Sequence, residues 1–396
     1  MATIKAIILK NETNRLGDYI REVNVRNRDL KVTRLLGVGL EKKFFPSIAN
    51  IIGTDLSNYK VIKKGQFGCK FMSVGRDGIL PVSILEDDEP AIISSAYYAF
   101  EVNDPNELLP EYLMMWLSRP EFDRELWFYS GGDVRGGVNY EAFCDMPIYF
   151  PSIERQREIV SEYETLTRRI RLNEQMIEKL EATAQALYRK TFVDNIDKQN
   201  LPQGWRMGCM GDLCTISSSK RIFESEYCNN GIPFYRGKEI SQKKRGEQVT
   251  DLIYISEKRY NEIIRKYGKP ACGDILLTAV GTIGNSYLVQ EEDFYFKDGN
   301  IVWFHDFVST GVNFYIYEYM QNILFDKIVE EAAIGSTQKA LTIQSLLSLE
   351  IVIPSIGLLR KFGEKNSILY KNNQNKKQEN LILTELQSLL LAKMGQ

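Results

Sequence analysis

A run of ten residues near the middle of the chain, RGKEISQKKR at 236–245, concentrates positive charge. It holds five cations and one carboxylate, Glu239, which gives a local charge of +4. Such clusters neutralise the phosphates of nucleic acid, and arginine can also bond guanine from the major groove. We predict nucleic-acid contacts here, with a solvated loop as the alternative. The predicted contact residues are Arg236, Lys238, Lys243, Lys244 and Arg245, preceded by Lys220 and Arg221.

Three other segments carry weaker candidates for the same contacts. Lys70 and Arg76 lie in CKFMSVGRDG at 69–78, where positive charge is sparser. Two glycine-rich segments, GGDVRGG at 131–137 and GSTQKA at 335–340, lack the spacing of a nucleotide-binding loop. Glycine allows close backbone approach, and Arg or Gln can bond bases or phosphates. We therefore predict contacts from Arg135, Thr337, Gln338 and Lys339, with a plain turn as the alternative.

Composition argues against several classes of enzyme. The 396 residues include one histidine, His305, so His-based triads and His-rich metal sites have little to be built from. We interpret His305, which follows GNIVWF, as the end of a strand. No apolar run reaches membrane-spanning length, and the net charge of −2 confines any nucleic-acid surface to a local patch. We expect a cytoplasmic protein with no membrane segment, no metal site and no cofactor.

The chain contains an internal repeat. A shift of 203 residues, without a gap, pairs PSI at 151–153 with PSI at 354–356 and holds through the segments around them. Upstream the shift slips to 206, where SVGRDG at 73–78 faces AVGTIG at 279–284. The chain therefore consists of two copies that differ in their loops.

Each copy mixes short strands with helical pieces and ends in a long helix. GDILLTAV, GNIVWF, AIISSAYYAF and MPIYF have the composition of strands, whereas the segments at 111–129 and 312–332 have helical periodicity. Ser152 and Ser355 are expected to cap the long helices. The predicted fold class is α/β, of the α+β type.

The two long helices are expected to form a coiled coil. The helix at 153–192 alternates apolar steps of four and three around a single Asn173. The helix at 356–395 fits less well, because 370–380 is polar, and we expect its centre to be exposed or to face a partner. The predicted seam residues are Ile159, Tyr163, Leu166, Ile170, Asn173, Ile177, Leu180, Leu187, Phe362, Leu369, Leu383 and Leu390.

Each of the two helices is expected to be on the order of 60 Å long, which is too long for a helix that stands alone in solvent. We therefore expect them to pack antiparallel between two similar globular domains. This arrangement has pseudo-twofold symmetry. The predicted boundaries are a first domain at 1–150, a helix at 151–193, a second domain at 194–354 and a helix at 355–396.

Several segments resemble the DNA-specificity subunit of type I restriction-modification systems. In the second copy they are LPQGWRMGCMGDLCTIS, IPFYRGKEI, GDILLTAVGTIG, KDGNIVWF and GSTQKALTIQSLLSLEIVIPS. In the first copy they are FFPSIANIIGTDLSNYKVIKKGQF and GGDVRGGVNYEAFCDMPIYFPSIERQREIV, without an LPxGW opening. The resemblance covers essentially the full chain, and no single motif decides it.

This resemblance implies two target-recognition domains that each read one half of a split double-stranded DNA site. It also implies that the long helices set the spacing and dock two methyltransferase subunits, with restriction subunits in the full complex. The chain has no Pro-Pro dipeptide, which the motif of DNA amino-methyltransferases contains, so we predict a non-catalytic subunit. The alternatives are a free-standing DNA-binding regulator and a coiled-coil adaptor with no nucleic-acid role.

Overall fold

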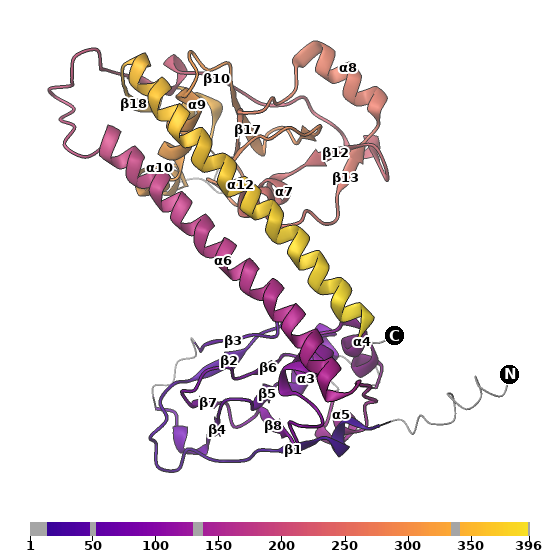
Figure 1. The fold of residues 1–396 in the computed structure, drawn as a ribbon. Coiled ribbons are helices and arrows are strands. Elements are labelled where there is room, and N and C mark those ends of the chain that lie inside the picture. The colour runs from indigo at the N-terminus through magenta and orange to yellow at the C-terminus, as the bar shows by residue number, and fades with distance from the viewer. Residues whose placement is uncertain (1–13, 48–52, 130–137, 334–340, 395–396) are drawn as a thin grey trace. The chain divides into compact units, whose positions relative to one another are not determined.

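The computed structural model describes residues 14–47, 53–129, 138–333 and 341–394. It divides into two compact units, one formed by 1–169 with 384–396 and the other by 170–383. Figure 1 labels their elements. Each unit contains one end of both long helices, α6 (Ile153–Phe192) and α12 (Ile356–Lys393).

The first unit is built on a four-stranded antiparallel sheet in the order β1–β8–β5–β6. Two antiparallel pairs, β2 with β3 and β4 with β7, accompany it. Its strands are β1 (Ile20–Glu22), β2 (Leu36–Val38), β3 (Phe44–Pro46), β4 (Lys60–Ile62), β5 (Phe67–Cys69), β6 (Val82–Ile84), β7 (Ala91–Ile93) and β8 (Tyr98–Val102).

The helices of the first unit are short before α6. The segment predicted as helical at 111–129 is split at Pro120, because proline is tolerated in a first turn but not inside a helix. The helices are α2 (Val74–Asp77), α3 (Pro110–Leu117), α4 (Pro120–Tyr129) and α5 (Tyr140–Cys144), with 3-10 turns η1 (Leu16–Asp18), η2 (Leu56–Asn58) and η3 (Phe71–Ser73).

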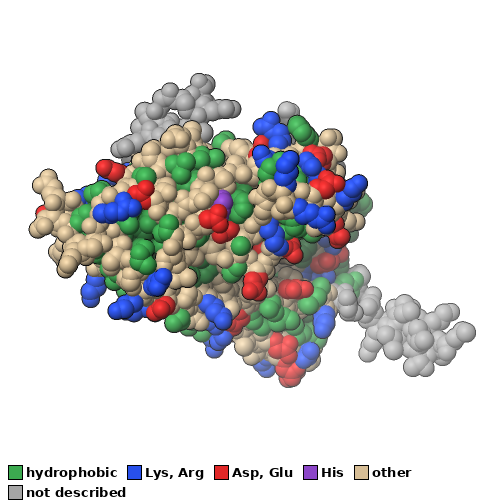
Figure 2. All heavy atoms as spheres, turned by 90° about the horizontal axis from the view of Figure 1, so that it is seen from above, with side chains coloured by type: hydrophobic (Ala, Val, Ile, Leu, Met, Phe, Trp, Pro, Cys, Tyr) green, Lys and Arg blue, Asp and Glu red, His purple; other side chains and the backbone are tan. Residues whose placement is uncertain are grey.

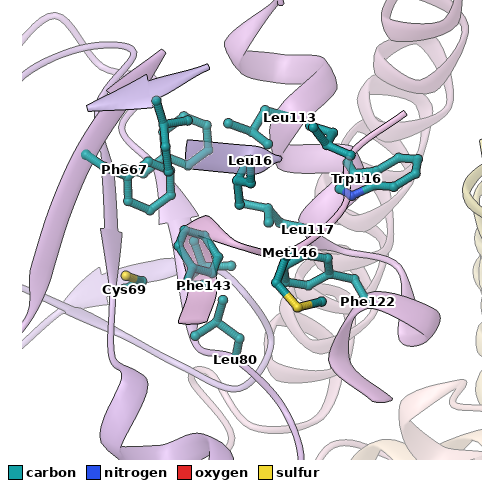
Figure 3. Close-up of a cluster of buried hydrophobic side chains, with 14 of the residues drawn as sticks. Leu16, Phe67, Cys69, Leu80, Leu113, Trp116, Leu117, Phe122, Phe143 and Met146 are labelled. Atoms are coloured by element: carbon teal, nitrogen blue, oxygen red, sulfur yellow. The ribbon is translucent and has the colours of Figure 1, made fainter. Parts of the chain in front are cut away.

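A cluster of aromatic and aliphatic side chains fills the space between this sheet and its helices (Figure 3). The Phe143 ring of α5 has its centroid 5.1 Å from that of Phe71 and 5.4 Å from that of Phe100. Val160 of α6 and Leu391 of α12 belong to the same buried cluster. The core of the first unit therefore includes a residue from the far end of the sequence.

The second unit has a matching sheet in the order β10–β17–β14–β15, a second sheet in the order β11–β13–β12–β16, and the pair β18 with β9. Its strands are β9 (Arg206–Cys209), β10 (Thr215–Ser217), β11 (Tyr227–Cys228), β12 (Ile232–Tyr235), β13 (Ile253–Ile255), β14 (Ile275–Thr278), β15 (Ser286–Leu288), β16 (Tyr295–Phe296), β17 (Ile301–His305) and β18 (Glu350–Ile353). Its helices are η4 (Met210–Asp212), η5 (Glu224–Glu226), α7 (Gly237–Arg245), α8 (Glu257–Tyr267), α9 (Val312–Met320), α10 (Ile323–Ala333) and α11 (Ile343–Leu347).

The two units repeat one architecture. Strands β1, β8, β5 and β6 correspond in order and direction to β10, β17, β14 and β15. Elements β8 and β17, α5 and α11, and α6 and α12 begin 203 residues apart, as the internal repeat predicts. The predicted α+β fold with two similar domains and long helices is confirmed.

One predicted strand is wrong. The segment MPIYF at 146–150 forms only an isolated bridge, between Arg15 and Pro147. Its counterpart β18 is a strand because four residues of β9 pair with it. A proline at the pairing position has no N–H to donate, so the ladder does not extend from Pro147.

Helices α6 and α12 lie antiparallel and side by side within each unit. In the second unit the Asn173 amide donates to the Asn380 side-chain oxygen at 2.9 Å, and in the first the Gln387 amide donates to the Thr167 hydroxyl at 2.7 Å. Every predicted seam residue on both helices is buried or half-buried. The heptad pattern therefore marks the side of each helix that is covered.

The polar centre of α12 is only partly exposed. Lys371, Asn372, Asn375 and Gln378 face solvent, as expected from the sequence, whereas asparagines on the other side of the helix are covered. Asn366 and Asn373 are 1% and 4% exposed, and Asn380 follows at the same interval of seven residues. The Asn373 amide donates to Glu181 of α6 at 3.1 Å. Hydrogen bonds across the pair thus allow asparagine to occupy seam positions that usually carry apolar residues.

Helix α12 passes close to the start of α9 in the second unit. A Cβ atom on Gly363 would lie 2.3 Å from the Cα atom of Gly311, which itself has a φ of +88°. Both positions therefore require glycine. Their counterparts 203 residues earlier are Leu108 and Val160, two buried residues of the first core.

Gln156 ties the first turn of α6 to the first unit. Its fully buried side chain accepts a hydrogen bond from the Leu109 N–H at 2.9 Å. Its amide donates to the carbonyls of Glu107 at 2.8 Å and Pro151 at 3.0 Å. The counterpart on α12 is Leu359, which is equally buried but makes only apolar contacts.

We expect Gln156→Leu to lower the free energy of unfolding by about 2 kcal/mol, because one backbone N–H and two backbone carbonyls in part-buried positions lose the partner that the buried Gln156 side chain provides. Urea unfolding of the full chain measures this, with the exposed Arg157→Gln as the matched control. A Gln156→Leu variant as stable as the unchanged protein would show that apolar packing is sufficient at this position, as it is at Leu359.

Candidate nucleic-acid interface

The basic segment predicted to contact nucleic acid forms a helix rather than a loop. It spans α7, which ends at Gly246 with a φ of +73°. Ile240 of α7 is fully buried in a cluster with Leu276 of β14 and Tyr287 of β15. One face of the helix therefore belongs to the core, and only the remaining faces are available for a ligand.

Most cations of this helix already have a carboxylate partner. Lys238 lies 3.5 Å from Asp251, and Arg245 lies 2.5 Å from Glu247. The remaining pairs are Lys243 with Glu292 at 2.5 Å and Arg236 with Glu239 at 2.6 Å. Carboxylates from outside the segment thus offset much of the local charge of +4.

Arg236 forms the most buried of these pairs. Glu239 is fully buried and accepts hydrogen bonds from the Arg236 backbone N–H at 2.7 Å and from its guanidinium at 2.6 and 3.2 Å. Burial alone would raise the pKa of Glu239, but these hydrogen bonds outweigh it and hold the pKa below its usual value. Arg236 therefore positions the start of α7.

Lys244 differs from its neighbours. Within the described part of the chain no carboxylate lies at ion-pair distance from its ammonium group, and burial lowers its pKa. Its side chain lines a cavity beside α6 and α12. The lack of a described carboxylate partner separates it from the other cations of α7, although Arg245 lines the same cavity.

A second group of cations gathers around Tyr267 at the end of α8. The ammonium groups of Lys220 and Lys266 lie 4.5 and 5.3 Å from the centre of its ring. Tyr267 is 42% exposed, and neither lysine has a described carboxylate partner. In Figure 2 Lys and Arg side chains gather on the side of the view where Figure 1 places α8. We call Lys220, Lys266 and Tyr267 the Tyr267 platform.

The platform is only partly visible in the sequence. Lys220 was a predicted contact residue, but Lys266 and Tyr267 were not, although IRKYGK places cations beside an aromatic residue. Arg221, the neighbouring prediction, is paired with Asp298 at 2.9 Å. The Tyr295 hydroxyl accepts the Lys220 backbone N–H at 3.0 Å, which fixes this segment next to β16.

In the first unit the two predicted cations lie apart from any such cluster. Lys70 is half-buried before η3 and has no described carboxylate at ion-pair distance. Arg76 is exposed and donates two hydrogen bonds to Asp77, at 2.9 and 2.8 Å, which raise the pKa of the guanidinium and lower that of the carboxyl. The predicted contacts Arg135, Thr337, Gln338 and Lys339 lie outside the described residues.

The end of α4 carries exposed aromatic side chains that sequence reasoning did not single out. Trp127, Phe128 and Tyr129 are 43%, 77% and 60% exposed. Exposed aromatic groups are costly in water and mark contact surfaces, including those that stack on or wedge between bases. The corresponding positions 203 residues later, Glu330, Glu331 and Ala332, are not aromatic.

His305 is the last residue of β17, as predicted. Its side chain also makes several specific contacts that the sequence did not predict. Its Nε2 lies 2.9 Å from the Ser217 hydroxyl of β10, and its Nδ1 lies 2.8 Å from Asp306. Its ring stacks on Trp303 with centroids 4.0 Å apart. One histidine can thus form a Ser-His-Asp series, so the count of histidines alone does not exclude one.

The part of the chain that the structure describes contains no group of three or more His, Cys, Asp or Glu side chains that could hold a metal ion. None of its helices is long and apolar enough to span a membrane.

Comparison with known proteins decides the family. A family model described as the Type I restriction modification DNA specificity domain matches residues 78–182 and 202–384, once in each copy of the repeat. These matches cover more than half of the chain. The chain belongs to this family. The family predicted from the sequence is confirmed, and with it the prediction of a DNA-specificity subunit rather than a catalytic one.

Individual relatives agree with the family. Over 267 residues the chain is 29% identical to a protein of Haemophilus influenzae named as a type I restriction enzyme specificity subunit. That alignment covers 64% of this chain and 63% of the relative, so it spans less than two thirds of either. The Type I restriction enzyme HindI specificity subunit of the same organism is 21% identical, with 90% of this chain and 91% of the relative covered.

A solved structure shares the fold. The crystal structure of a Type-I restriction-modification system S subunit from M. genitalium matches with a TM-score of 0.62. The match covers 98% of this chain and 97% of that chain, at 15% identity. The likeness of fold therefore extends over both units and both long helices.

We expect Arg236→Ala to destabilise the specificity subunit by about 2 kcal/mol, because it leaves the Glu239 carboxylate buried without its cation; partial exposure of Arg236 reduces the effect. The folded-state pKa of Glu239 is lowered, so its pairing with Arg236 stabilises the protein above the unfolded pKa. This stabilisation is lost as the pH falls through the folded pKa. The difference between the two proteins in urea unfolding should therefore shrink in acid.

The matched control is Arg236→Ala combined with Glu239→Gln, which removes the buried charge and should recover part of the lost stability. An Arg236→Ala variant with unchanged stability at neutral pH would show that the guanidinium does not hold α7 in place.

Proposed function

We propose that this DNA-specificity subunit reads a double-stranded DNA site in two halves, one with each unit, and directs methyltransferase partners to it. The observation that carries the proposal is the repetition: two domains of one DNA-specificity family share a strand order and a 203-residue repeat. Two equivalent recognition domains in one chain suit a DNA site that consists of two halves. The proposed recognition domains keep the boundaries 1–150 and 194–354, and the proposal places the chain in the cytoplasm with its DNA.

In the second recognition domain we assign DNA contact to the Tyr267 platform. Lys220 and Lys266 carry charge that no described carboxylate offsets, whereas most cations of α7 are already paired. Unpaired lysines suit phosphate groups, and an exposed tyrosine between them can contact the sugar-phosphate backbone or a base edge. Lys238 and Arg245 remain candidates, since their pairs are exposed and exchange readily with water and ions.

In the first recognition domain we assign contact to the aromatic end of α4, with Lys70 and Arg76 as weaker candidates. Trp127, Phe128 and Tyr129 offer apolar surface that can press against bases or sugars in a groove. The different chemistry of the two domains, cationic in one and aromatic in the other, fits two different half-site sequences.

The helices offer a surface for protein partners. Four aliphatic residues of α12 lie outside the seam and are exposed. They are Ile368, Ile382, Leu386 and Leu389, at 64%, 52%, 44% and 53%. Exposed aliphatic residues at such spacing suit a partner helix. We assign this surface to methyltransferase subunits, two of them by the repeat, with restriction subunits joining the complete assembly. A free-standing regulator would not need the exposed aliphatic surface of α12, and an adaptor without a DNA role would not need the proposed DNA contacts.

We expect Lys220→Gln combined with Lys266→Gln to weaken DNA binding about tenfold and to reduce the slope of log affinity against log salt by about two, because two phosphate contacts are lost. Mobility shift of the subunit assembled with its methyltransferase partners measures both. Lys361→Gln with Lys365→Gln, at exposed positions of α12, is the charge-matched control. An unchanged salt slope would remove the platform from the interface.

We expect the purified chain alone to transfer no methyl groups, and the addition of methyltransferase subunits to give methylation at one split sequence. Sequencing of methylated DNA after each reaction measures this. Methylation by the isolated chain, or methylation at an undivided site, would contradict the proposed division of labour.

A further inference from the structure

The second unit contains a cavity that shares only Arg245 with the DNA contacts assigned above. Its volume is about 580 Å³, within the range of small-molecule sites. It lies between α6, α9, α12 and the last residues of α7. All of these residues belong to the second unit, so the cavity is part of one compact body.

Its walls combine aromatic rings with aliphatic side chains. The Tyr317 ring of α9 meets the Tyr370 ring of α12 edge to face, with centroids 5.7 Å apart. Leu180 of α6 and Leu369 of α12 continue the apolar lining. Tyrosine faces attract organic cations, and aliphatic walls accommodate the hydrocarbon part of such a ligand.

One carboxylate on this lining lacks a cationic partner. Glu318 of α9 is 6% exposed, and its Oε2 accepts a hydrogen bond from the Gln185 amide at 2.5 Å. Among the described residues no group donates to its Oε1, and no cation lies within ion-pair distance. Burial raises the pKa of Glu318 to about 7, with a smaller contribution from the nearby Glu181.

Two of the three cations that line the cavity are paired with other carboxylates. Lys377 binds Glu181 at 3.1 Å and also donates to the Lys244 carbonyl at 3.0 Å. Arg245 is paired with Glu247. The remaining charged groups of the lining are Glu178 and Lys244, and neither forms a described ion pair.

We propose that this cavity binds a small organic cation, an alkyl ammonium or guanidinium, with Glu318 as its anionic anchor and Tyr317 and Tyr370 as its walls. The bound cation supplies the partner that the carboxylate lacks. The proposal does not depend on how the chain reads DNA.

Calorimetric titration of the full chain with butylguanidinium tests the site, with pentanol and pentanoate as neutral and anionic probes of similar size. We expect saturable binding of the guanidinium alone. Binding should weaken as the pH falls from about 8 to about 5.5, because protonation of Glu318 removes the anchor. The other titratable groups that face the cavity are Glu178, Glu181, Lys244, Arg245, Lys377, Tyr317 and Tyr370. Burial raises the pKa of both tyrosines further above neutrality.

Glu318→Gln should weaken binding at least tenfold and leave the free chain as stable as before or more stable, since glutamine can keep the contact with Gln185. Tyr317→Leu should weaken binding a few fold. Glu174→Gln, an exposed change on α6 outside the cavity, is the matched control. Equal binding by the Glu318→Gln variant, preferential binding of pentanoate, or no binding of any probe would overturn the proposal.

Discussion

Each core of this protein is completed by a helix that begins in the other half of the chain. Leu391, near the end of α12, lies in the core of the first unit, and Tyr188 and Phe192, at the end of α6, lie in the core of the second. Neither repeat therefore contains its whole core within its own sequence. Because an unfilled core site costs several kcal/mol, pairing of α6 with α12 and folding of the two units depend on each other.

The seam between these helices explains how a polar sequence can still specify a pair. Asn366 and Asn373 would destabilise a purely apolar seam, but hydrogen bonds such as that from Asn373 to Glu181 satisfy their amides. A buried asparagine tolerates few alternative registers, since a shift would leave its amide unsatisfied. The polar stripe thus favours one alignment of α6 on α12 over others that an apolar stripe would permit.

The two repeats keep one topology while their details diverge where function is expected to differ. Gln156 anchors one long helix by hydrogen bonds, and Leu359 anchors the other by packing. The end of α4 carries exposed aromatic residues, whereas the same positions of α10 do not. Strand order is fixed by the shared core, and exposed helix ends and loops are free to change with the DNA to be read.

The sequence by itself determined the repeat, the long helices and the residues of their seam, because these follow from local periodicity and from a constant shift of 203 residues. It also indicated the family, through the resemblance of several segments in both copies. The sequence did not determine which charged side chains lack an ion-pair partner. The +4 of RGKEISQKKR is a sum over neighbours in sequence, whereas Coulomb interactions depend on neighbours in space, and Asp251 and Glu292 come from outside the segment. For the same reason Lys220 and Tyr267, far apart along the chain, became one platform only in the folded domain, and the unpaired Glu318 became recognisable only once burial and the surrounding helices were known.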